Sequence, residues 1–218
     1  ADTLGSYSVA VGNAALGAQN FTTATDSYNV AVGYNAGHQV TTGVQNTLIG
    51  GLAGDALTAT NNNVAIGYLA LSADTLGSRN IAIGVNALDS QNFTTSTNSY
   101  NIGIGHQAGT AITTGVHNVL MGGLAGDALT DADFNTALGD ATLGADTLGS
   151  RSVAVGYAAL NAQNFTTATD SYNVAVGALA GAAVTTGIQN SFLGGTVGQS
   201  LTTGGSNVAF GYQALRDD

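Results

Sequence analysis

A nine-residue cassette, approximately Asn-Val-Ala-Val-Gly-x-x-Ala-Leu/Gly, occurs twelve times along the chain. Its glycines stand at Gly12, Gly33, Gly50, Gly67, Gly84, Gly105, Gly122, Gly139, Gly156, Gly177, Gly194 and Gly211. Successive glycines are 21, 17, 17 and 17 residues apart, and this series recurs without insertion or deletion. The sequence therefore consists of three 72-residue super-repeats, at 1–72, 73–144 and 145–216. Such regularity is typical of a solenoid, in which each coil covers the apolar face of the next.

Each cassette predicts a short strand followed by a turn. β-Branched and small residues alternate, as in Val30, Ala31 and Val32, and Gly33 then permits positive φ. A Thr-rich segment such as 39–42 predicts a second strand in each coil. Proline, which removes ladder donors, is absent. We therefore expect an all-β fold, a parallel β-solenoid (β-roll) of twelve coils that forms a single repeat domain over residues 1–218.

Both ends of the chain fall in phase with the 72-residue period. Each super-repeat opens with Ala-Asp-Thr-Leu-Gly-Ser, and Asp217 and Asp218 stand where a fourth would begin. Terminal repeats of a free-standing solenoid usually differ, because they cap an open stack. We therefore expect a segment of a longer fibre, or a subunit that stacks end to end. A fragment cut at convenient boundaries is the alternative.

The charge balance restricts the partners. Thirteen acidic residues, all Asp, stand against three Arg and no Lys, which gives a formal net charge of -10. Nucleic acids and anionic membranes need clustered basic residues, so neither is expected as a partner. No apolar run approaches the roughly 18 residues of a membrane-spanning helix, so membrane insertion is not expected either. Cysteine is absent, so the fold does not depend on disulfides.

Ten of the twelve cassettes begin with Asn, and Ser8 and Ser152 take this place in the other two. In stacked coils these side chains line up, and each amide can bond to the coil above and the coil below. We expect a structural Asn ladder. The functional alternative is a row of amides that binds a ligand.

The middle residue of the cassette is bulky once in each super-repeat, at Leu48, Leu120 and Phe192. It is otherwise Ala, or Gly at Gly103. If the flanking Val and Ile fill the coil interior, the middle residue points outward. Leu48, Leu120 and Phe192 are then candidate contacts between chains, and a local shift of register is the alternative.

Every fourth coil is four residues longer, and the extra length falls in 19–28, 91–100 and 163–172. Insertions in solenoids form loops on one face, often the binding face. The shared aromatic and amide residues predict stacking on a sugar and hydrogen bonding to it. The candidate binding residues are Asn20, Phe21, Tyr28, Asn92, Phe93, Tyr100, Asn164, Phe165 and Tyr172. The alternative is that each loop packs its Phe and Tyr over the coil edge. Asn-Phe-Thr is also a sequon, which makes Asn20, Asn92 and Asn164 candidates for N-glycosylation.

Strings such as SVAVG at 8–12, NVAVG at 29–33 and NIAIG at 80–84 resemble the head repeats of trimeric autotransporter adhesins. Longer cassettes such as NVAIGYLAL at 63–71 are similar to repetitive fibre proteins of phages and marine microbes. The resemblance covers almost the whole chain and implies a left-handed parallel β-roll in which three chains associate. The adhesin repeat is usually shorter, and neither a coiled-coil stalk nor a membrane anchor is present in this sequence.

Catalysis is not expected, because no nucleophile, base and acid stand at related positions of the repeat. No spacing of acidic or histidine residues matches a metal site, and no cofactor is expected. We predict a structural and adhesive fibre segment, extracellular, at a cell surface or on a virion, whose partners are copies of itself and a cell-surface glycan. A self-assembling filament subunit that stacks end to end is one alternative. A glycan-binding or ice-binding module is another, the latter because Thr pairs such as Thr41 and Thr42 recur.

Overall fold

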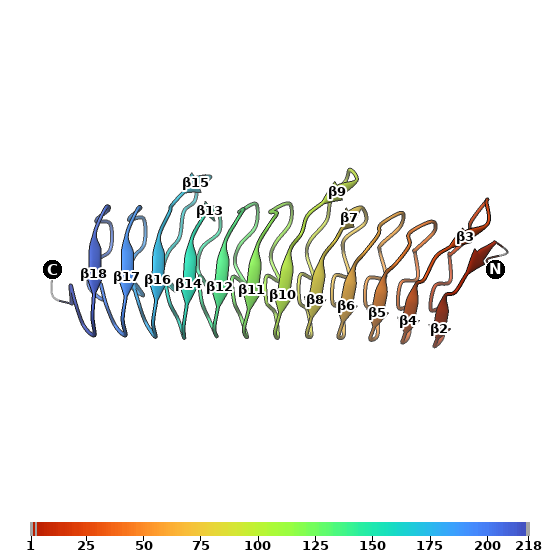
Figure 1. The fold of residues 1–218 in the computed structure, drawn as a ribbon, viewed down its shortest axis with the longest axis horizontal. Helices are drawn as coiled ribbons and strands as arrows, with labels where there is room; N and C mark the ends of the chain where they lie inside the picture. Colours follow the sequence, from red (N-terminus) through yellow and green to blue (C-terminus); the bar gives the residue numbers. More distant parts are fainter. Residues whose placement is uncertain (1, 3, 217–218) are drawn as a thin grey trace. The chain divides into compact units, whose positions relative to one another are not determined.

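The computed structural model describes residue 2 and residues 4–216. The chain folds into two compact units, Ala1–His106 and Gln107–Asp218. The described residues contain strands and turns but no helix. Figure 1 shows that in each unit short strands stand side by side, one per coil. The division between the units falls inside the second super-repeat, so it does not follow the 72-residue period.

In the first unit, six three-residue strands form one parallel sheet in the order β10-β8-β6-β5-β4-β2. All neighbours pair in the same register, so equivalent cassette residues stand beside one another. The strands are β2 (Val9–Val11), β4 (Val30–Val32), β5 (Thr47–Ile49), β6 (Val64–Ile66), β8 (Ile81–Ile83) and β10 (Ile102–Ile104). Two shorter parallel pairs join a long coil to the segment before it: β1 (Gly5–Ser6) with β3 (Thr25–Asp26), and β7 (Gly77–Ser78) with β9 (Thr97–Asn98).

The second unit repeats this arrangement with the strand order β18-β17-β16-β14-β12-β11. Its six strands are β11 (Val119–Met121), β12 (Thr136–Leu138), β14 (Val153–Val155), β16 (Val174–Val176), β17 (Ser191–Leu193) and β18 (Val208–Phe210). One short pair joins β13 (Gly149–Ser150) to β15 (Thr169–Asp170). With six coils in each unit, the expected all-β parallel solenoid of twelve coils is confirmed.

The second strand expected in every coil is absent from most of the ordinary 17-residue coils, and among the described residues only those that precede a long coil carry one, as β7 and β13. Residues 39–42, for example, form turn and irregular structure. Their backbone still bonds from coil to coil, since the N–H of Gln39 donates to Asp55 O at 2.9 Å and that of Thr41 to Thr58 O at 3.0 Å. The chain bends at positive-φ residues on either side of this segment, at Gly37 and Gln45.

The cassette glycines are required by close backbone stacking as well as by their conformation. Gly33 has φ of +140°, and a Cβ at this position would lie 2.4 Å from the carbonyl oxygen of Gly50. A side chain therefore has neither the conformation nor the space that it needs.

The Asn side chains form an interior ladder, as expected. Asn46, Asn63 and Asn80 are fully buried. The Oδ1 of Asn46 accepts the backbone N–H of Asn63 at 3.0 Å, and the Oδ1 of Asn63 accepts that of Asn80 at 2.9 Å. Their Nδ2 groups donate across the coil, for example from Asn63 to Gly77 O at 3.0 Å. Because the amides are buried and bonded within the chain, the alternative of a ligand-binding row is wrong.

The strands face the opposite way from the expectation. The middle residue points into the coil, so Ala31, Ala65, Leu48 and Leu120 are fully buried and Phe192 is 1% exposed. The flanking Val and Ile, expected in the interior, lie on the outer side of the sheet. The prediction that Leu48, Leu120 and Phe192 contact another chain is therefore wrong.

These bulky residues fill space that glycines leave open. The ninth cassette residue points inward, and it is Leu in two coils of each super-repeat and Gly in the other two. A Cβ at Gly37 would lie 2.5 Å from Leu48 Cδ1, and one at Gly54 would lie 2.8 Å from Leu48 Cδ2. Phe192 lies in the same way against Gly181 and Gly198. The large middle residue thus fills the space left by the ninth-position Gly of its own coil and of the preceding coil.

Candidate binding surfaces

A buried carboxylate holds the second and the third long coil to the coil before it. In the first unit Asp74 is fully buried, and its Oδ1 accepts the backbone N–H of Gly77 at 2.9 Å and of Phe93 at 3.3 Å. Its Oδ2 accepts Gln91 Nε2 at 2.6 Å, and the Oε1 of Gln91 accepts Asn101 Nδ2 at 2.8 Å. This chain of bonds connects the long loop to the Asn ladder.

The second unit contains the same network around Asp146. Its carboxylate accepts the N–H of Gly149 at 3.0 Å, the N–H of Phe165 at 3.1 Å and Gln163 Nε2 at 2.5 Å. Burial raises the pKa of both Asp74 and Asp146, although the glutamine amides and backbone N–H groups act in the opposite direction. Both carboxyl groups are enclosed by donors of their own chain, which is the arrangement of a structural anchor.

The structure divides the candidate sugar-binding residues into two groups. Phe21, Phe93 and Phe165 are only 5–6% exposed, because each packs beneath its loop. The prediction that these three rings contact a ligand is therefore wrong, and the alternative of packing over the coil is correct for them. Tyr28, Tyr100 and Tyr172 are exposed by 51%, 43% and 52%. A ligand can therefore reach the tyrosines, and their role in binding stays a prediction.

The sequon asparagines Asn20, Asn92 and Asn164 are exposed on the long coils. Asn92 Oδ1 accepts the hydroxyl of Thr75 at 3.0 Å, and Asn164 Oδ1 accepts that of Thr147 at 3.2 Å. Thr94 and Thr166, the third residues of two of the sequons, are exposed as well. The surface is open to a modifying enzyme, and N-glycosylation stays a prediction.

The tyrosines belong to an exposed column that the sequence analysis missed. The residue before each cassette has φ between +49° and +66° and is exposed. In the second unit His117 and Phe134 stack with ring centroids 4.9 Å apart, and the guanidinium of Arg151 lies 4.9 Å from Phe134 and 5.9 Å from the ring of Tyr172. The sequence contains this pattern, because planar side chains recur at the position immediately before the cassette.

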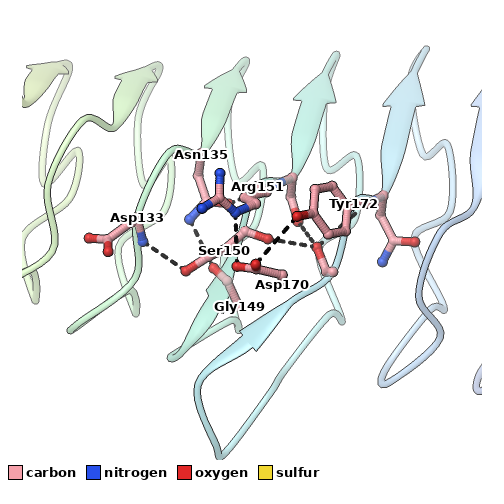
Figure 2. A network of polar contacts seen from close by, with 10 residues as sticks. Asp133, Asn135, Gly149, Ser150, Arg151, Asp170 and Tyr172 are labelled. Atoms are coloured by element: carbon pink, nitrogen blue, oxygen red, sulfur yellow. Dashed lines mark hydrogen bonds and ion pairs between the residues drawn. The ribbon is translucent and has the colours of Figure 1, made fainter.

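Figure 2 shows how Arg151 is held in this column. Its Nε lies 3.0 Å from Asp170 Oδ1, and the hydroxyl of Tyr172 donates to the other oxygen of Asp170 at 3.4 Å. In the first unit Arg79 lies over the ring of Tyr100 at 5.5 Å, and Tyr7 stacks on Tyr28 at 5.2 Å. The ring faces are therefore used in stacking between coils, and a ligand meets mainly ring edges and hydroxyls.

The sequence matches no protein-family model, and neither a curated protein nor a solved structure matches it. Function must therefore be argued from the geometry. Among residues 2 and 4–216 there is no group of three or more His, Asp, Glu or Cys that could hold a metal ion. Over the same residues no helix has the length and apolar character needed to cross a membrane.

Proposed function

We propose that this chain is a structural segment of an extracellular, cell-surface or virion fibre. Copies of the chain associate with one another, and the resemblance to trimeric adhesin heads favours three. The segment serves as a stiff scaffold, and the long coils present exposed groups to a receptor.

The observation that carries this proposal is the Asn ladder together with the coil-to-coil backbone bonds. The side-chain oxygen of each of these buried Asn residues accepts the backbone N–H of the equivalent Asn in the next coil, where the irregular backbone offers no strand partner. Each coil of a unit is therefore stabilised by the next coil along the stack. Such an interior is suited to bearing load and resisting proteases, because few backbone groups open independently.

Immunogold labelling of the source organism and its phages with antibodies against this chain tests the proposal. We expect label along surface or virion fibres, and native chain that resists proteinase K. Label confined to the cell interior would rule out the fibre function, whatever the association state of the purified protein.

Adhesion through the long coils is the second part of the proposal, and the exposed Tyr100 and Tyr172 favour it. We expect wild-type protein to bind members of a glycan array, and the double variant Tyr100→Ala and Tyr172→Ala to lose that binding. Thr42→Ala and Thr186→Ala, at exposed positions on ordinary coils, form the matched control. Equal binding by both variants would exclude the tyrosines as the receptor site.

Ice binding receives less support. Several Thr hydroxyls donate to the next coil, as Thr58 does to Thr75 O at 2.9 Å and Thr130 to Thr147 O at 3.0 Å. These groups are committed to the fold, and the paired Thr41 and Thr42 stand on irregular backbone instead of a flat strand.

A further inference from the structure

The outer side of each parallel sheet is a largely apolar surface, named the sheet face. It consists of the first and third residues of every three-residue strand, which stand in two columns because the strands pair in register. In the first unit eleven of these twelve residues are Val or Ile, and the exception is Thr47. In the second unit only Thr136 and Ser191 are polar.

The sheet face is accessible in the isolated chain. Ile49, Met121 and Leu193, one from each super-repeat, are 37%, 41% and 46% exposed. Strands 4.8 Å apart, three residues long at 3.3 Å per residue, give the face about 300 Å² in each six-coil unit before side-chain relief. Exposed tyrosines next to the strands, Tyr34 and Tyr68 in the first unit and Tyr157 in the second, widen it. Before this widening the patch on each unit is about as large as the largest apolar patch of a typical soluble monomer, and such patches are often functional.

The charge distribution favours this face for contact between copies. None of the thirteen Asp and three Arg stands in either column, although the chain carries a net charge of -10. Two copies that approach through other surfaces bring acidic groups together and repel one another. Contact through the sheet faces removes apolar side chains from water without burying any charge.

The repeat also makes the sheet face complementary to itself. Each column contains one side chain per coil, and neighbouring side chains in a column are separated by the distance between strands. The ridges and grooves on the sheet face of one copy therefore have the same period as those on another copy. In the second unit a hollow of about 280 Å³ opens around the small Ser191 and is lined by Val174, Val176, Leu193, Val208 and Phe210. An apolar side chain from a facing sheet fits such a hollow, as in sheet packing at about 10 Å.

We propose that the sheet face is the surface through which a second copy of this chain associates. The inference deepens the proposed fibre function and rests on it for its biological setting. It replaces the wrong expectation that Leu48, Leu120 and Phe192 make this contact. The physical driving force is burial of the Val and Ile columns against the same columns of the partner.

Light scattering during size-exclusion chromatography tests the proposal with three proteins. The first is the wild type, and the second carries Ile66→Lys, Ile83→Lys, Leu138→Lys and Val155→Lys on the sheet face. The third carries Thr42→Lys, Thr94→Lys, Thr166→Lys and Thr186→Lys at exposed positions elsewhere, and so has the same added charge. We expect the wild type and the Thr→Lys control to run as a multiple of 21.4 kDa, and the sheet-face variant to run at 21.4 kDa.

A milder set, Val64→Thr, Ile81→Thr, Val153→Thr and Val174→Thr, guards against loss of folding. Thr47 and Thr136 already occupy this column, so the strand accepts Thr. We expect this set to retain the wild-type circular dichroism spectrum and to weaken association at least tenfold. A monomeric wild type at about 100 μM, or a Lys set with wild-type mass, would overturn the proposal. Either result leaves the immunogold test of the fibre function unaffected, and failure of that test leaves the mass measurement unaffected.

Discussion

At the scale of single residues, the interior is a balance of volumes between neighbouring coils. Coils with Leu at the ninth position have Ala in the middle, and coils with Leu or Phe in the middle have Gly at the ninth position. Leu48 lies against Gly37 and Gly54, and Phe192 against Gly181 and Gly198. The coil is too thin for two large residues at one level, and where both are small, as at Ala31 and Gly37, Leu48 of the next coil fills the space.

Replacing Leu120 with Ala tests this packing. Leu120 is fully buried, so we expect the Leu120→Ala variant to lose about 2–5 kcal/mol of the free energy of unfolding through lost contacts and a residual cavity. Leu124→Ala in the same coil is the matched control, since Leu124 is 37% exposed and its truncation removes less packing. Urea denaturation monitored by circular dichroism measures both, and an equal loss would contradict the inward placement of Leu120.

The Asn ladder predicts a second residue effect. Asn63→Ala removes the acceptor of the Asn80 N–H and the donor to Gly77 O, and both partners are buried. Each orphaned group costs about 1–3 kcal/mol. We expect a much lower melting temperature for this variant than for Asn13→Ala, whose side chain is exposed. Equal melting temperatures would show that water reaches the ladder.

At the scale of the element, the long coil is an insertion whose base is held by buried contacts. A buried carboxylate, a Gln amide and a Phe ring hold its base, and the Tyr above remains exposed. The period alone located these loops, because the four extra residues recur every 72. It did not separate Phe from Tyr, since both are aromatic and the distinction depends on which side of the loop backbone each one occupies.

The anchoring carboxylates predict a pH dependence. Burial raises the folded-state pKa of Asp74 and Asp146, and also of Asp55 and Asp127. A raised folded pKa means that the folded state binds these protons more tightly. The resulting stability is present below the unfolded value of about 3.9 and is lost as pH rises through the folded values. We therefore expect the melting temperature of dilute protein to rise as pH falls from 7 to about 4.

The double variant Asp74→Asn and Asp146→Asn is the control for this pH effect. Its amide groups do not titrate, so the rise in melting temperature on acidification should be smaller than in the wild type. The variant should also melt at a lower temperature at every pH, because an amide donor then faces Gln91 Nε2 or Gln163 Nε2. A melting temperature that falls steadily from pH 7 to 4 in the wild type would contradict the assignment.

At the scale of the whole molecule, each unit has a packed interior and an apolar outer sheet face. The chain has a net charge of -10, and no charged residue stands in the sheet face of either unit. Burial of the face between copies stabilises the folded state only when the copies meet, so stability is linked to protein concentration.

This linkage gives a measurement on the unmodified protein. We expect the melting temperature of the wild type to increase with concentration from about 1 to 100 μM, because association binds only the folded state. The set of Ile66→Lys, Ile83→Lys, Leu138→Lys and Val155→Lys should show no such increase. A wild-type melting temperature independent of concentration, together with a monomeric mass, would argue against self-association. Differential scanning fluorimetry covers the required range.

The sequence by itself determined the period, the parallel in-register stacking, the Asn ladder and the position of the long coils. Each of these follows from a repeat of constant length, because equal coils place equal residues above one another. Only the tertiary structure decided which side of the strand faces inward. Alternation assigns Val30 and Val32 to one face of the strand and Ala31 to the other. Because both faces are apolar, the pattern does not show which of them is buried. The interior volume settles the choice, since the space within a 17-residue coil admits Ala, and it admits Leu or Phe only beside Gly.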